Sequence, residues 1–348
     1  MGGCSSRGVG NNVTASVVHP AELGGAEQLL WRSFAEDSSL NSPFLSWPFV
    51  EAIGRVRDDA RVATFRDGSR VCGFLAYQVG PDRAGVPIGS TICDAQAVIA
   101  PSDWPFEPRR LIDSAGLSRW SFDHLTTQQA AFLPYHRRRH RSPVVALSAG
   151  YDAFLEEVRA NSKDLITQVG RRRRKLEREV GPVVCEWQSS EPEGDLLRLL
   201  QWKSDQYARD GSWDRFAVPW IAAAVQSLAR SRDPACTGLL TSVRAGEHLV
   251  AVHFGLLGSD RLCWWFPTYS PEFGRYSPGL ILLLDVIAEA ARRGVAMVDL
   301  GRGEHDYKLR ATSRFYEVAE GEVVAGGERD ADPPEREVAE RGGINFCT

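Results

Sequence analysis

Two segments of the sequence repeat one pattern of turns and strands. Residues 242–261 read SVRAGEHLVAVHFGLLGSDR, and residues 64–83 read TFRDGSRVCGFLAYQVGPDR. When the two segments are aligned without a gap, five positions are identical, namely Arg66, Gly68, Gly80, Asp82 and Arg83 on Arg244, Gly246, Gly258, Asp260 and Arg261. Glycine at both turns is typical of a hairpin followed by a second turn. Because the apolar register between the turns also agrees, we expect two similarly folded halves.

Length and composition exclude several classes of protein. The chain has 348 residues, 43% hydrophobic and 25% charged, which is ordinary for a globular protein of two domains. The longest apolar run, residues 280–287, is broken by Asp285 and is too short to span a membrane. A net charge of −4 argues against a dedicated nucleic-acid binder. Seven scattered cysteines without C-x-x-C spacing predict no metal site and favour the cytoplasm.

The repeat and its flanks divide the chain into four parts. Residues 1–16 are rich in Gly, Ser and Asn, and residues 325–348 are charged and contain proline, so we expect both to be disordered. Between them we expect an N-terminal domain at 17–150 and a C-terminal domain at 151–324. Alternating helical and hairpin patterns indicate an α/β or α+β fold.

The second half has the clearer pattern of elements. Apolar spacing predicts helices at 195–209 and 220–230, the latter opened by a proline. Three strands are then expected, at 237–243, 249–257 and 262–269. The order of elements is therefore two helices followed by an antiparallel meander.

A helix and a strand follow the meander. Ser277-Pro278-Gly279 predicts a helix start, with Ser277 as its cap, and the apolar spacing continues to residue 293 before a strand at 295–300. A helix N-terminus presents N–H donors and partial positive charge to a pyrophosphate, with Gly279 allowing close approach and Arg275 as a phosphate partner. The alternative is that these residues only begin a well-capped helix.

These stretches resemble a known family. The runs YSPEFGRYSPGL at 269–280 and VDLGRGEHDYK at 298–308 are similar to the acyltransferase domain of the GNAT superfamily. More narrowly, they resemble the cellulose-biosynthesis-type (CelD/BcsL) acetyltransferases, which are relatives of the FemABX peptidyltransferases. Residues 42–49 and 171–177 also resemble segments of that family. The resemblance covers residues 20–320.

The resemblance implies a fold and a reaction. The fold is two GNAT-like domains in tandem, each a mixed, mostly antiparallel sheet flanked by helices, the first being a degenerate copy that contributes the acceptor groove. The reaction is acyl transfer, from acetyl-CoA or another acyl-CoA, to an amine or hydroxyl of a small molecule, saccharide or peptide in the cytoplasm of a bacterium. No metal is implied. The residues expected to bind the donor are Arg275, Tyr276, Ser277, Gly279 and Leu280.

The family's donor loop is only partly present. GNAT enzymes carry an Arg/Gln-x-x-Gly-x-Gly/Ala loop, whereas residues 275–279 of this chain contain a single glycine, Gly279, and Pro278, which supplies no N–H. Two alternatives therefore stay open. One is a FemABX-like peptidyltransferase that takes its acyl group from aminoacyl-tRNA, and the other is a ligand-binding protein without turnover. The basic run 171–175 could bind phosphates of CoA or tRNA, or could be a solvated helix face.

Four residues are candidates for the chemistry. Lys308, one of only four lysines, is expected to polarise the reacting carbonyl, and Tyr307 to protonate the leaving group or else to pack in the core. His253 replaces an apolar residue of the first copy and is either a general base or a hydrogen-bonded structural histidine. Asp299 ends a strand, where it could bind a ligand or cap the following glycine-rich turn.

Overall fold

The structure is a computed structural model that describes residues 13–312 and 314–326. Its strands are β1 (Val13–Val18), β2 (Ala60–Asp67), β3 (Arg70–Val79), β4 (Ala84–Pro87), β5 (Arg119–Thr126), β6 (His136–Ala146), β7 (Val183–Glu186), β8 (Arg232–Asp233), β9 (Cys236–Ala245), β10 (His248–Leu257), β11 (Arg261–Tyr269), β12 (Met297–Asp299) and β13 (Phe315–Val324). β1 begins inside the segment expected to be disordered, because it pairs along its whole length with β2. Residues 1–12 and 327–348, also expected to be disordered, lie outside the described residues.

The helices follow the predicted order in the second half. They are α1 (Gly25–Ala35), α2 (Trp47–Gly54), α3 (Pro108–Ser114), α4 (Tyr151–Asn161), α5 (Leu165–Glu179), α6 (Pro192–Asp210), α7 (Pro219–Ala229), α8 (Pro278–Arg292) and α9 (Asp306–Ala311). The helices and strands predicted between 195 and 300 all form, with ends that differ slightly from those expected. Among the described helices, none is both long and apolar enough to cross a bilayer.

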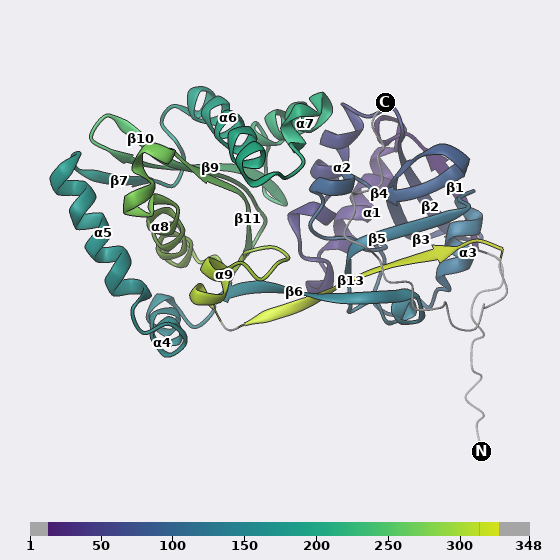
Figure 1. The fold of residues 1–348 in the computed structure, drawn as a ribbon. Coiled ribbons are helices and arrows are strands. Elements are labelled where there is room, and N and C mark those ends of the chain that lie inside the picture. The colour runs from purple at the N-terminus through teal and green to yellow at the C-terminus, as the bar shows by residue number, and fades with distance from the viewer. Residues whose placement is uncertain (1–12, 313, 327–348) are drawn as a thin grey trace, which may run out of the picture.

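One sheet runs through both halves. Its strand order is β1-β2-β3-β4-β5-β13-β6-β12-β11-β10-β9-β7, with β8 beside β9. Within the described residues, only β4–β5 and β11–β12 pair in parallel among the named strands, and the rest are antiparallel. Figure 1 shows the two halves as lobes with β6 and β13 running between them. This is the expected α/β fold, a mixed and mostly antiparallel sheet flanked by helices.

The sequence repeat corresponds to a structural repeat. In the first hairpin Ala63 pairs with Leu75, and in the second Thr241 pairs with His253, which is the pair that the sequence alignment makes equivalent. A register shift also falls at equivalent positions, next to Phe65 in the first hairpin and Val243 in the second. The turn glycines of the two hairpins, Gly68 and Gly246, have φ angles of 58° and 57°, a left-handed conformation that other residues rarely adopt. The two repeated segments therefore form equivalent hairpins, with a register shift at the same place in each.

The last strand of each half pairs with the other half. β6, the last strand before the second half, lies beside β12, while β13, the last strand of the second half, lies between β5 and β6. The two halves of the sequence thus exchange their final strands.

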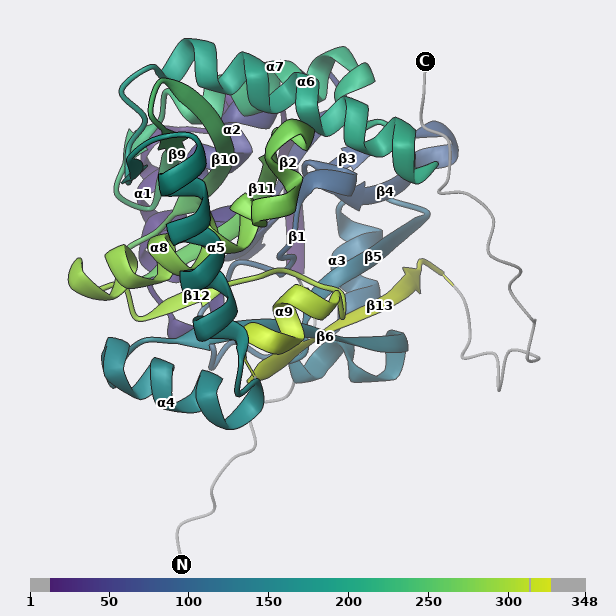
Figure 2. The same ribbon diagram turned by 60° about the vertical axis from the view of Figure 1, so that its left-hand side comes forward.

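Helices cover both faces of the second half. α6 and α7 pack on one face of β9–β11, and α8 packs on the other with α4 and α5 beside it (Figures 1 and 2). One apolar core is shared between the halves, because Phe44 of the first half contacts Trp265 of β11 with ring centroids 5.1 Å apart. A shared core and an exchanged strand hold the cleft between the halves in a defined shape.

Candidate functional site

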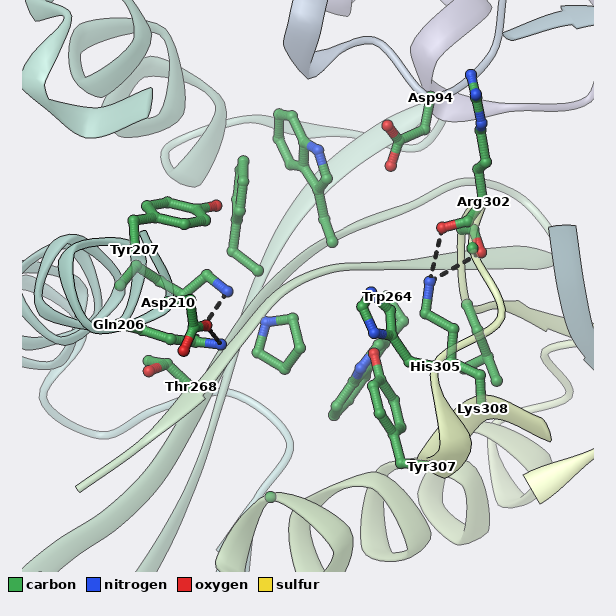
Figure 3. Close-up of a pocket in the computed structure, with 18 of the residues that line it drawn as sticks. Asp94, Gln206, Tyr207, Asp210, Trp264, Thr268, Arg302, His305, Tyr307 and Lys308 are labelled. Atoms are coloured by element: carbon green, nitrogen blue, oxygen red, sulfur yellow. Dashed lines mark hydrogen bonds between the residues drawn. The ribbon is translucent and has the colours of Figure 1, made fainter. Parts of the chain in front are cut away.

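A cleft of about 910 Å³ lies where the two halves meet. Figure 3 shows Gln206, Tyr207 and Asp210 of α6 on one side and Arg302, Tyr307 and Lys308 on the other. The residues that line it are Thr91, Asp94, Asp123, His124, Lys203, Gln206, Tyr207, Asp210, Arg215, Trp264–Tyr269, Gly274, Ser277, Gly279, Leu280, Leu300–Gly303, His305, Tyr307 and Lys308. Most come from the second half, and four come from the first.

Five of the nine residues predicted for the site line this cleft. Ser277, Gly279 and Leu280 lie at the beginning of α8, and Tyr307 and Lys308 lie in α9. The remaining four, Arg275, Tyr276, His253 and Asp299, do not line it. The structure thus joins the helix tip and the tyrosine–lysine pair, which the whole of α8 and β12 separates in the sequence.

The beginning of α8 is built differently from the expected capped helix. Ser277 has a φ angle of 51°, in the left-handed region, and its side chain makes no capping hydrogen bond, so the predicted cap is wrong. Its hydroxyl accepts a hydrogen bond from Arg172 of α5 instead. Pro278 has no N–H, and the N–H of Leu280 bonds to the carbonyl of Ser277 at 3.0 Å. The tip therefore combines few backbone donors with an arginine held beside it.

Arg275 and Tyr276 lie behind this tip. Tyr276 is fully buried, and its hydroxyl donates to Glu179 at 2.7 Å and accepts from Arg275 at 2.6 Å. Arg275 has a side chain that is 67% exposed. Tyr276 consequently supports the tip from the core, whereas the Arg275 guanidinium is accessible from solvent.

Lys308 is buried in the wall of the cleft. Its ammonium group donates to the carbonyls of Gly301 at 2.9 Å and Arg302 at 3.0 Å. Burial lowers its pKa, although the charges of Asp94 and Asp299 act in the opposite direction. The turn it binds contains Gly303 with a φ angle of 112°. Two of the three ammonium protons therefore hold this turn, which leaves the third for a ligand.

Tyr307 lines the cleft next to Lys308. Burial raises the pKa of its phenol to about 12, so the hydroxyl keeps its proton at neutral pH. A protonated phenol in a cleft can donate a hydrogen bond or a proton to a bound group.

His253 does not line the cleft, but it packs against Trp264, which does. It is fully buried and stacks on Trp264 with centroids 3.9 Å apart. Its Nε2 accepts from the backbone N–H of Trp265 at 3.2 Å, so its Nδ1 carries the proton and faces the hydroxyl of Thr241 at 3.2 Å. Burial lowers its pKa to about 3, and the ring is neutral. This geometry fits the second of the two expected roles, a hydrogen-bonded structural histidine, which here positions Trp264.

Asp299 is engaged by its own turn and by the exchanged strands. Its carboxylate accepts from the N–H of Gly301 at 3.0 Å, the hydroxyl of Tyr316 at 2.6 Å and the hydroxyl of Ser142 at 3.3 Å. Arg261 lies 3.7 Å away as an ion partner. Asp299 thus caps the glycine-rich turn, which is the second of its two expected roles, and it lies behind the residues that line the cleft.

Sequence reasoning missed a charged group that the first half contributes. His124 of β5 lies between two carboxylates, with Nδ1 3.1 Å from Asp123 and Nε2 3.9 Å from Asp94. Burial would lower the pKa of His124, but the hydrogen bond to Asp123 and both negative charges raise it overall. Burial also raises the pKa of Asp94, although His124 opposes this. No motif marks these residues, which gather within the first half, and only the meeting of the two halves places them beside the turn at Gly301.

Among the described residues, no three His, Cys, Asp or Glu side chains gather as metal ligands. The site therefore consists of a helix tip, a tyrosine–lysine pair, a carboxylate–histidine group and the α6 wall.

Comparison with known proteins assigns the second half. Residues 163–309 match the family model for the Acetyltransferase (GNAT) domain. This segment spans α5 to most of α9 and contains the helix tip, Tyr307 and Lys308. A search of curated protein sequences finds no match.

Three solved structures share the fold over most of the chain. FemX has a TM-score of 0.58 and 12% identity, covering 88% of this chain and 96% of that one. The C-terminal domain of a protein from Agrobacterium fabrum, proposed to be a lysylphosphatidylglycerol synthetase, has a TM-score of 0.55 and 13% identity, covering 87% and 93%. A conserved protein of unknown function from Bacteroides thetaiotaomicron has a TM-score of 0.53 and 11% identity, covering 87% and 98%. At these identities the likeness concerns the fold.

Proposed function

We propose that this acyltransferase, whose GNAT domain spans residues 163–309, moves an acyl group from acyl-CoA to an amine or hydroxyl of its acceptor. One observation carries the proposal. Gly279 at the helix tip, Tyr307 and Asp94 line the same cleft, so a donor, a proton donor and a proton acceptor can meet there. The motifs at 269–280 and 298–308 favour the cellulose-biosynthesis-type branch, in the cytoplasm of a bacterium.

The binding site of the acyl donor, acyl-CoA, is assigned to the N-terminal tip of α8. The positive end of the helix dipole favours the pyrophosphate of CoA, and Gly279 lets it approach the backbone. Because Pro278 removes one backbone donor, the guanidinium of Arg172, held against Ser277, supplies the missing hydrogen bonds. Arg275 is exposed at the same end and can reach a terminal phosphate.

The proton acceptor is assigned to Asp94. Its raised pKa makes it a stronger base than an ordinary aspartate, and His124 between the two carboxylates keeps it in place. The acceptor's N–H or O–H proton passes to Asp94, and the freed lone pair forms the new C–N or C–O bond. The C–S bond of the thioester breaks in the same sequence.

The leaving thiolate takes its proton from Tyr307, whose phenol is protonated at neutral pH. The third N–H of Lys308 is assigned to the carbonyl oxygen, where negative charge develops in the transition state. Asp94 thus gains the proton that the acceptor loses, and Tyr307 supplies the proton that the thiolate gains, so no step in this transfer requires a metal ion.

The test of the donor uses two arginines of α5. Arg172→Gln removes the guanidinium held at Ser277, whereas Arg174→Gln removes an exposed arginine of the same helix for which the structure gives no ion pair. We expect acetyl-CoA binding, measured by titration calorimetry, to weaken at least tenfold in Arg172→Gln and to stay unchanged in Arg174→Gln. Acetyl-CoA that fails to bind the unmodified protein contradicts the proposal.

A second candidate is transfer from aminoacyl-tRNA, favoured by a cationic stripe on α5. Arg171, Arg174 and Arg178 are exposed at helical spacing on one face, and the described residues give none of them an ion pair. Under this reading Arg174→Gln weakens tRNA binding with a reduced salt dependence, while Arg172→Gln has the smaller effect. The same two variants thus separate the two donors.

A further inference from the structure

Two cations on the α6 wall of the cleft form no ion pair with any of the described residues. Lys203 belongs to α6 and Arg215 to the following 3₁₀ turn (Arg215–Ala217), and both line the cleft. Within the described part of the chain, neither has a carboxylate within the 4.0 Å of an ion pair. Lysine is almost never this deeply buried without a partner, and Lys203 is only 8% exposed.

The two cations are arranged around one aromatic ring. The ammonium of Lys203 lies 5.1 Å from the ring centroid of Tyr207, and the guanidinium carbon of Arg215 lies 5.5 Å from it. The hydrogen bond that the structure gives the ammonium runs to the side-chain oxygen of Gln206, at 3.2 Å. Burial, together with the nearby charge of Arg215, lowers the pKa of Lys203 to about 8, although the charge of Asp210 acts in the opposite direction. Like charges held together in this way are unfavourable unless an anion joins them.

The acids described in this region lie beyond ion-pair distance of the two cations and accept hydrogen bonds from other groups. Asp210 accepts a hydrogen bond from Gln206 at 3.5 Å. Asp214 accepts from Ser204 at 3.2 Å and from the N–H of Phe216 at 2.9 Å, which caps the 3₁₀ turn. In Figure 3, Asp94 lies away from Tyr207, on the side of Arg302. Among the described residues, the charge of Asp94 interacts with Arg215 and that of Asp210 with Lys203, but neither carboxylate lies within 4.0 Å of its cation. The place of a direct counterion is therefore open to an anionic ligand in the cleft.

We propose that Lys203 and Arg215 form a subsite for an anionic oxygen group, a phosphate or a carboxylate, carried by the acceptor. Assigning this group to the acceptor rests on the proposed function, which places the donor phosphates at the α8 tip beside Arg172. Arginine supplies a planar fork for two oxygens, and lysine supplies a compact charge. The acceptor is then an acidic molecule, and its anionic group orients the nucleophile towards Asp94.

The experiment measures how readily the amine of Lys203 is modified. The chain has only four lysines, so reductive methylation followed by peptide mass spectrometry can quantify each one separately. Inorganic phosphate and acetate are titrated in turn at constant ionic strength, without donor, and exposed Lys163 is the internal control. We expect one or both anions to protect Lys203 saturably, by fivefold or more, with Lys163 unchanged. Phosphate acting alone identifies a phosphorylated acceptor, and acetate acting alone identifies a carboxylate.

Variants extend the test. Arg215→Gln is expected to weaken the protection of Lys203 at least tenfold, whereas Arg70→Gln, at an exposed position on β3, is expected to leave it unchanged. In calorimetry, Lys203→Arg retains anion binding and Lys203→Met loses it. Lack of saturable protection by either anion, or equal protection in Arg215→Gln, overturns the proposal. Because no donor and no turnover are involved, failure of the acyl-transfer proposal is seen separately, as absent acetyl-CoA binding.

Discussion

The ammonium of Lys308 lies 3.0 Å from the carbonyl oxygen of Arg302, and the side chain of Arg302 reaches into the other half of the protein. That guanidinium donates to the carbonyl of Asp123 at 3.0 Å and lies 2.8 Å from Nε2 of His140. A lysine of α9 is thus linked through one turn to the strand that carries His124. Lys308 therefore both lines the cleft and holds the turn that joins its two walls.

Replacing Lys308 is expected to affect catalysis more than binding of the donor. Lys308→Ala removes the N–H assigned to the carbonyl oxygen, and we expect kcat to fall about 100-fold or more, as for loss of an oxyanion donor. It also leaves two carbonyls of the turn without their partner, so the free energy of unfolding should fall by about 1–3 kcal/mol. Steady-state kinetics and urea unfolding check the two effects. An unchanged kcat in a folded Lys308→Ala protein would remove Lys308 from the mechanism.

Tyr307→Phe tests the proton donor. The phenol stays protonated up to a pH of about 12, so its loss should lower kcat about 100-fold while KM for acetyl-CoA stays within a factor of three. Phenylalanine keeps the ring and its packing, which makes the variant its own structural control. An acyl-CoA analogue with a more acidic thiol as leaving group should recover most of the lost rate. Absence of that recovery would argue for the packing role.

The pH dependence tests Asp94. The proposed base must be ionised, and burial raises its pKa, so kcat/KM should fall as the pH falls through that raised value. We expect Asp94→Asn to lose at least 100-fold in kcat/KM and to remove the acidic limb of the profile. Asp123→Asn, which alters the far side of His124, should shift this limb and keep most of the rate. An Asp94→Asn protein with a normal acidic limb would exclude Asp94 as the base.

The buried His253 should make the free energy of unfolding depend on pH. Its pKa is about 3 when folded and near 6.5 in the unfolded chain, so the unfolded state binds more protons below pH 6.5. Its contribution is thus complete above pH 6.5 and is lost, by about 1.4 kcal/mol per pH unit, as the pH falls towards 3. The double variant Thr241→Ala with His253→Leu recreates the Ala63–Leu75 pair of the first half. Urea unfolding between pH 4 and pH 7 should show a shallower slope for the double variant, and equal slopes would disprove the assignment.

Much of the fold was accessible from the sequence because it repeats. The gap-free alignment of the two segments predicted two equivalent hairpins, and the pairing of Thr241 with His253 follows that of Ala63 with Leu75. The exchange of β6 and β13 was not predictable in the same way. Apolar alternation says that a strand has a buried face, but it does not say which distant strand becomes its neighbour.

Site residues could be predicted only where they belong to a short, continuous sequence motif. The Ser277–Gly279 start of α8 and the Tyr307–Lys308 pair carry motifs, and both line the cleft. Asp94 and His124 carry none, because the burial and mutual charges that shift their pKa values arise only in the folded protein. His253 illustrates the opposite case, since its residue type suggests catalysis but its burial and its stacking on Trp264 indicate support.

The strand exchange has a consequence for how the protein can be divided. A fragment that stops at residue 150 would leave the edge of β5 without β13, and a fragment that starts at residue 151 would leave β12 without β6. Bare edges of this kind invite aggregation, so neither piece should be soluble when expressed alone. Co-expression of both pieces should restore a single cooperative melting transition. Although each half contains the same hairpin, the strand pairing makes the two halves depend on each other.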